Sequence, residues 1–86
     1  MTYTDHHIAE NQFIRIFSED ANPTDLLWHR DEKDRTVLVL NKTDWSFQFD
    51  NQIPTRLKKD QSITIPQGIW HRVIKGTGNL KLLITE

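Results

Sequence analysis

The most informative part of the sequence is Ser62-Ile63-Thr64-Ile65-Pro66-Gln67-Gly68-Ile69-Trp70-His71-Arg72-Val73-Ile74. Its first four residues alternate between polar and apolar, which is typical of a strand with one buried face. Pro66-Gln67-Gly68 should end that strand, because proline cannot donate a ladder hydrogen bond and glycine accepts a positive φ. In the strand that follows, His71 shares a face with Ile69 and Val73. A histidine among apolar residues after a fixed turn suits ligand or metal binding, and it equally suits a hydrogen-bonded core position.

The composition indicates one small domain that covers residues 1–86. A chain of this length buries only about 60–65% of its unfolded surface, so we expect a thin core. The formal charge is −1 with acids and bases interspersed, which argues against a nucleic-acid partner. No apolar run approaches membrane-spanning length, and a sequence without cysteine excludes disulfides and is compatible with a cytoplasmic protein. We expect residues 1–10 to form a flexible, solvated N-terminal segment.

Short strands are predicted along the rest of the chain, with turn residues between them. The clearest covers residues 45–50, where aromatic and polar residues alternate. Further strands are predicted over residues 13–17, 26–31, 36–40, 55–58 and 80–84. Strands that recur at a spacing of roughly 8–12 residues, without a convincing helix between them, predict an all-β sandwich or barrel. The tripeptide Trp-His-Arg occurs at residues 28–30 and 70–72, which suggests two strands that meet in space.

Residues 60–71 resemble the second cupin motif, G-x5-P-x-G-x2-H. Pro66, Gly68 and His71 match the motif, and Asp60 stands where the family has glycine. Aspartate is one of the few residues that tolerate a left-handed backbone, so this departure is mild.

Residues 28–42 resemble an eroded form of the first cupin motif, H-x-H-x(3,4)-E-x6-G. His29 matches the first histidine, Asp31 stands at the second, Arg35 at the glutamate and Lys42 at the glycine. Together the two motifs make the chain similar to small single-domain cupins of the RmlC-like superfamily.

The resemblance implies a small jelly-roll barrel with a metal site inside it, near one mouth. Carried over to this sequence, the ligands would be His29, Asp31 and His71, a set that suits divalent Fe, Mn, Ni or Zn. Arg35 cannot ligate, and its charge would repel a metal if it points inward. In that case it could pair with Asp31 or bind an anionic group of a ligand.

Three functions remain open at this stage. The first is a cupin that binds a small polar or anionic molecule, with Arg35 and His71 as ligand-binding residues. The second is a metal-dependent enzyme of the dioxygenase or isomerase type, and the third is a structural barrel filled by side chains. Trp28 and Trp70 are either packing residues or part of a pocket mouth. No catalytic residue is identified, and the strand over residues 13–17 suggests a homodimer built through sheet edges.

Overall fold

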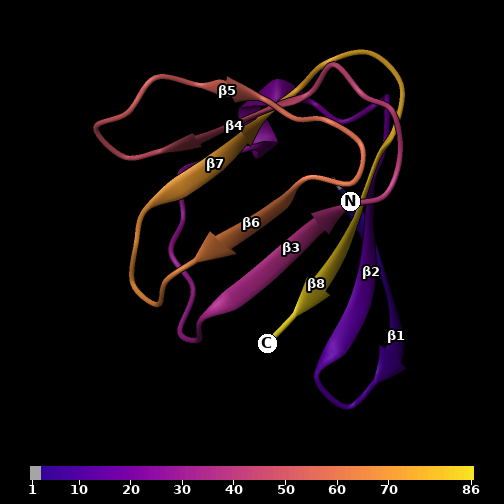
Figure 1. Cartoon of the computed structure of the whole chain (residues 1–86). Coiled ribbons are helices and arrows are strands. Elements are labelled where there is room, and N and C mark those ends of the chain that lie inside the picture. Colours follow the sequence, from indigo (N-terminus) through magenta and orange to yellow (C-terminus); the bar gives the residue numbers. More distant parts are fainter. Residues whose placement is uncertain (1–2) are drawn as a thin grey trace.

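The computed structural model describes residues 3–86, which form eight strands and one 3-10 turn (Figure 1). The strands build two antiparallel sheets, one of five strands in the order β1-β2-β8-β3-β6 and one of three in the order β5-β4-β7. The bounds of the elements are β1 Tyr3–Ala9, β2 Gln12–Phe17, the 3-10 turn Pro23–Asp25, β3 Arg35–Val39, β4 Ser46–Phe49, β5 Thr55–Arg56, β6 Ser62–Ile65, β7 His71–Ile74 and β8 Leu80–Thr85. The predicted all-β class is confirmed.

Aromatic and aliphatic side chains from both sheets form one core. Trp45 and Leu57 are almost fully buried, and so is Leu80 on the larger sheet. The indole of Trp45 donates a hydrogen bond from Nε1 to the carbonyl of Gly78 at 3.0 Å, so its polar atom is satisfied inside the core. Phe47 follows Trp45 on the buried face of the segment, as the alternation of residues 45–50 predicts.

The turn at Pro66-Gln67-Gly68 connects the two sheets, because β6 belongs to the larger sheet and β7 to the smaller one. Gly68 has a φ of +78°, a backbone conformation that side chains disfavour. The backbone N–H of Gly68 donates to the carbonyl of Asp31 at 2.9 Å, and the N–H of Gln67 donates to Oδ1 of Asp34 at 2.7 Å. The turn therefore fixes the segment that leads into β3.

Three expectations about local structure are corrected. Tyr3–Ala9 form strand β1 along the edge of the larger sheet, where a flexible segment was expected over residues 1–10; Met1 and Thr2 lie outside the described residues. Every residue of β1 is exposed, so the sequence offers no buried face to signal a strand. β2 is not an edge strand, because β1 covers it. Residues 26–31 form no strand and pair with β7 through a single isolated bridge.

The backbone at Asp60 agrees with the motif comparison. Asp60 has a φ of +71°, so it occupies the left-handed conformation for which glycine is usual. Within residues 3–86, no helix is long and apolar enough to cross a membrane.

Candidate metal centre

The two Trp-His-Arg tripeptides lie side by side, as the sequence suggested. His29 and His71 form an antiparallel bridge in which each backbone N–H donates to the other residue's carbonyl, at 3.0 and 2.9 Å. The two imidazole rings lie on the same side of this bridge, with ring centroids 4.3 Å apart. The antiparallel register therefore brings together two histidines that are 42 positions apart in the sequence.

The tryptophans and arginines of these tripeptides form two pairs across the bridge. The guanidinium of Arg72 lies 4.7 Å from the ring centroid of Trp28, and that of Arg30 lies 5.2 Å from the ring centroid of Trp70. Each arginine is thus in range of a cation–π interaction. Alternation along a strand directs these side chains away from the side that carries the histidines.

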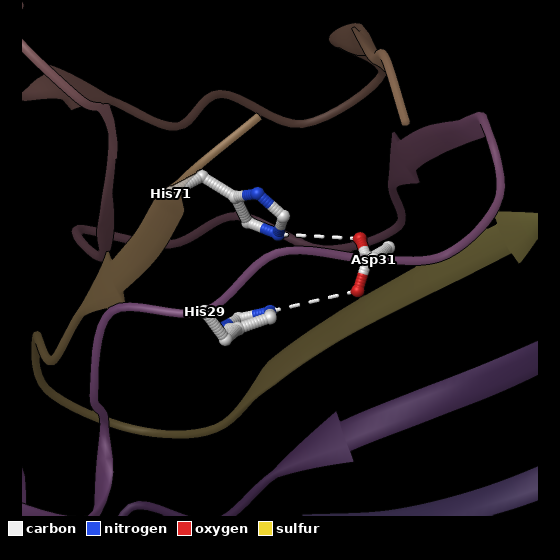
Figure 2. Close-up of side chains that lie close together, drawn as sticks. All are labelled: His29, Asp31 and His71. Atoms are coloured by element: carbon white, nitrogen blue, oxygen red, sulfur yellow. Dashed lines mark ion pairs between the residues drawn. The ribbon is translucent and has the colours of Figure 1, made fainter. Parts of the chain in front are cut away.

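Asp31 completes a cluster with the two histidines (Figure 2). Its Oδ2 lies 3.4 Å from Nε2 of His71, and its Oδ1 lies 4.0 Å from Nε2 of His29. One donor atom from each residue lies within 4.8 Å of the others. His71 is buried, Asp31 is largely buried, and the side chain of His29 is about half exposed. The three predicted metal ligands are therefore close together in space.

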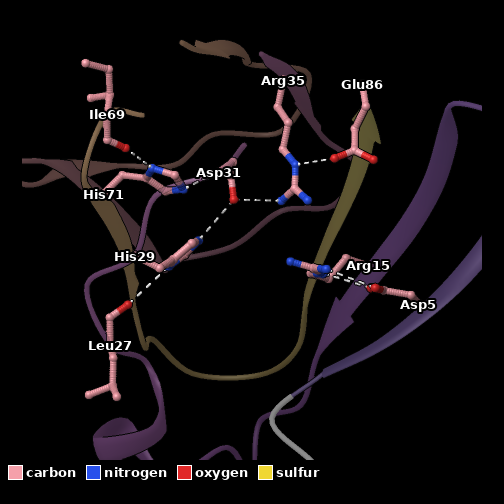
Figure 3. Close-up of polar contacts among 9 residues, drawn as sticks. All are labelled: Asp5, Arg15, Leu27, His29, Asp31, Arg35, Ile69, His71 and Glu86. Carbon is pink, nitrogen blue, oxygen red and sulfur yellow. Dashed lines mark hydrogen bonds and ion pairs between the residues drawn. The ribbon is translucent and has the colours of Figure 1, made fainter. Parts of the chain in front are cut away.

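The hydrogen bonds of the rings determine where their protons lie. Nδ1 of His71 lies 2.8 Å from the carbonyl of Ile69, and Nδ1 of His29 lies 3.2 Å from the carbonyl of Leu27 (Figure 3). A carbonyl only accepts hydrogen bonds, so both Nδ1 atoms are the donors. Burial, aided by His29 and an arginine nearby, lowers the pKa of His71 below its usual value, which favours the neutral ring. In a neutral ring with Nδ1 protonated, Nε2 presents a lone pair.

This arrangement fits a divalent cation. Oδ2 of Asp31 is buried and accepts no hydrogen bond within the described residues, although Nε2 of His71 lies beside it. Two lone pairs that face each other without a proton between them are unfavourable, and a cation would satisfy both. Histidine ligands commonly donate their other ring nitrogen to a backbone carbonyl, as both histidines do here. Two histidines and one carboxylate form a donor set typical of non-haem Fe(II), and the same atoms suit Mn, Ni and Zn.

Arg35 points toward this cluster, at the position where the cupin motif has glutamate. Its Nη1 lies 3.3 Å from Oδ1 of Asp31, and its Nε donates to Oε2 of Glu86 at 2.9 Å. Asp31 and Glu86 thus compensate most of the guanidinium charge that would oppose a metal. Arg35 occupies one face of the Asp31 carboxylate and leaves Oδ2 unpaired.

A second arginine, Arg15, which neither motif includes, lines the same cavity as the cluster. Arg15 of β2 pairs with both carboxylate oxygens of Asp5, at 2.8 and 2.9 Å. Arg15 lies between Phe13 and Phe17 on a strand face that is otherwise apolar and buried. This position in the sequence indicates that the charged side chain of Arg15 points inward. Asp5 itself gave no such signal, because it lies in the exposed strand β1.

The histidine and arginine side chains open into one cavity of about 260 Å³ between the sheets. Its lining includes Arg15, His29, Asp31, Arg35 and His71, together with apolar side chains from both sheets. Trp28 and Trp70 do not line it and are each about two-fifths exposed. The structure therefore brings Arg35 together with the three predicted metal ligands, and it leaves the two tryptophans outside the cavity.

No protein-family model matches the sequence, and no curated protein matches it. Several solved structures match its fold. An RmlC-like cupin family protein with a double-stranded β-helix fold from Methanocaldococcus jannaschii superposes with a TM-score of 0.73 and 10% identity, over 99% of this chain and 79% of that one.

Two further structures are longer than this chain. A cupin 2 conserved barrel domain protein from Leptotrichia buccalis gives a TM-score of 0.71 and 26% identity, over 95% of this chain and 38% of its own. Fe(II) HppE gives a TM-score of 0.68 and 19% identity, over 85% of this chain and 40% of the HppE chain. The agreement of these structures in fold, together with the two-sheet topology, identifies the chain as a small protein with the RmlC-like cupin fold.

Proposed function

We propose that this protein binds one divalent transition metal through His29, Asp31 and His71, and a small polar or anionic molecule in the adjoining cavity. The observation that carries the proposal is the buried Oδ2 of Asp31, which lacks a hydrogen bond and faces the lone pair of His71. A bound divalent ion would act as a Lewis acid toward an oxygen of the small molecule. The structural similarity to a protein described as Fe(II) HppE supports metal binding on this fold.

The test is a calorimetric titration of metal-free protein with Zn(II), Ni(II), Mn(II) and, under anaerobic conditions, Fe(II). We expect one ion per chain and its loss in His71→Ala. His6→Ala is the matched control, because His6 lies exposed on β1 and outside the cluster. Absence of binding with all four metals, or equal binding by His71→Ala, would refute the proposed site.

A metal-dependent enzyme is the second candidate. Three protein ligands leave coordination positions free on most divalent metals, and the cavity beside the cluster offers room for a substrate. The reaction class, whether dioxygenase or isomerase, would have to come from substrate screening of the metal-loaded protein. The cavity argues against the third reading, a barrel filled by its own side chains.

We also propose a homodimer in which the β1 edges of the two larger sheets pair with each other. β1 lies at one end of the five-stranded sheet, and its Ile8 is 57% exposed. A free strand edge can pair with the same edge of a second copy. Light scattering over a range of concentrations tests this directly. A monomer mass at every concentration would contradict it.

A further inference from the structure

We propose that the metal-loaded cavity selects a small monoanionic carboxylate with an apolar body, held by Arg15 and Arg35 beside the metal. The inference rests on the metal site proposed above and names the class of molecule that would bind next to it. The two guanidinium groups come from β2 and β3, the strands on either side of β8 in the larger sheet. Figure 3 shows both side chains, and both line the cavity.

Both arginines are held in place and still have a donor to offer. Arg15 uses Nε and Nη2 for Asp5, and Arg35 uses Nε for Glu86 and directs Nη1 at Asp31. In the described part of the chain, Nη1 of Arg15 and Nη2 of Arg35 make no hydrogen bond to protein. Their side chains are only 13% and 17% exposed, and the two unpaired nitrogens are not fully buried, so a ligand can reach them. A guanidinium fixed in this way is pre-organised to donate to a carboxylate.

The charges of the cavity favour a single negative charge on the ligand. The two arginines face three carboxylates, those of Asp5, Asp31 and Glu86, so these groups carry a net charge of −1 while the histidines are neutral. A divalent ion changes that net charge to +1. An uncompensated charge in a largely apolar cavity is costly, and a monoanion removes it.

A phosphate monoester fits this balance less well. It carries a charge of about −1.5 to −2 near neutral pH, which would leave the loaded cavity negative. Asp5 and Glu86 are counted because they pair with the arginines at 2.8 and 2.9 Å, although both are exposed. Asp25 lines the cavity but is exposed and forms no ion pair with either arginine within residues 3–86, so solvent screens its charge. The balance therefore favours a carboxylate over a phosphate.

The walls of the cavity determine the size and polarity of the part of the ligand beyond its carboxylate. Apolar side chains from both sheets line it, among them Phe17, Val37, Phe47, Val73, Leu82 and Ile84. Its volume of about 260 Å³ equals the liquid volume of roughly nine water molecules. A ligand of about nine non-hydrogen atoms or fewer, with a short branched apolar chain, matches both features.

The experiment compares isovalerate with its neutral isostere isovaleramide on Zn(II)-loaded protein, by calorimetry. We expect isovalerate to bind about 10- to 100-fold more tightly, because only the carboxylate forms charge-assisted hydrogen bonds to the arginines. Arg15→Met and Arg35→Met should each lose that preference. Arg35→Met should bind Zn(II) at least as tightly as the parent, since it removes a positive charge beside the site. Arg56→Met, at an exposed position on β5, is the matched control.

The outcomes separate the two proposals. If none of Zn(II), Ni(II), Mn(II) and Fe(II) binds, both the metal site and this inference are refuted; if another of these metals binds in place of Zn(II), the ligand comparison uses that metal. If Zn(II) binds but isovalerate and isovaleramide bind equally, or the arginine variants keep the preference, only the inference fails. The ligand comparison uses the parent protein, so it holds even where a variant does not fold. Tighter binding of inorganic phosphate than of isovalerate would overturn the assignment to carboxylates.

Discussion

Replacing Asp31 with asparagine should separate the metal-binding role of this side chain from its structural role. The size of the side chain is kept, and the new amide can donate a hydrogen bond to Nε2 of His71, which lies 3.4 Å from Oδ2. Arg35 keeps Glu86 as its partner at 2.9 Å. We therefore expect the free energy of unfolding of the metal-free variant to lie within about 1 kcal/mol of the parent's.

The metal-loaded protein should respond very differently. A divalent ion and a carboxylate about 4 Å apart attract each other by about 8 kcal/mol at an effective dielectric constant of about 20. An amide oxygen recovers only part of this, so we expect at least about a 100-fold loss of affinity, or about 2.7 kcal/mol. At free Zn(II) of about 100 times the parent's Kd, the stabilisation would fall from about 2.7 to about 0.4 kcal/mol. For a domain of 86 residues, the metal-induced rise in Tm would fall from about 11–22 °C to about 2–3 °C.

The assay is thermal unfolding followed by circular dichroism, with and without Zn(II). Asp25→Asn is the matched control, because it removes an exposed carboxylate from the same cavity without touching the cluster. It should keep the full metal-induced shift. An undiminished shift in Asp31→Asn would refute the reasoning, and so would a large loss of stability in the metal-free variant.

Three other predictions follow from the fold. Trp45→Ala should lower the free energy of unfolding by about 3–5 kcal/mol in urea titrations, because it empties a fully buried site and removes a hydrogen bond. Gly68→Ala and Gly78→Ala should each lower the free energy of unfolding by about 1–2 kcal/mol, since both glycines have positive φ and open space around them. Only Gly68→Ala should also weaken Zn(II) binding in calorimetry, because the N–H of Gly68 donates to the carbonyl of Asp31. A hydrogen bond from Arg15 lowers the pKa of Asp5, so the pair stabilises the fold at neutral pH and loses that effect as the pH falls through the lowered pKa. In acid titrations, Asp5→Asn should lack this loss, which we expect to be below about 1 kcal/mol.

The alternating strands were the predictable part of the fold. Residues 45–50 and 62–74 have clear periods, and strands β4, β6 and β7 lie within them. β1 has no buried face, so its place in the sheet depends on backbone pairing with β2 and on contacts such as Asp5–Arg15 and Tyr3–Phe17. Neither leaves a mark on a hydrophobic pattern. Residues 26–31 look like a strand, yet Gly68 and His71 hold them by individual hydrogen bonds instead of a ladder.

The site was predictable in part. Two motifs and a repeated tripeptide pointed to His29 and His71, which the bridge indeed brings together. Glu86 could not be anticipated, because its contact with Arg35 joins residues 51 positions apart that no motif relates. The outward direction of the tryptophans follows from strand alternation once the histidines are known to face inward.

The long separation in sequence between Asp31 and His71 has a consequence for the stability of the metal-loaded fold. A metal held by Asp31 and His71 would cross-link two segments about 40 residues apart and so close a loop in a chain that has no cysteine. In the chain-entropy model, a covalent link closing a loop of that size stabilises a protein by about 4 kcal/mol. Unlike a disulfide, this link would open without any redox partner. A chelator added to the metal-loaded protein would then lower its free energy of unfolding, as a reductant lowers that of a secreted protein.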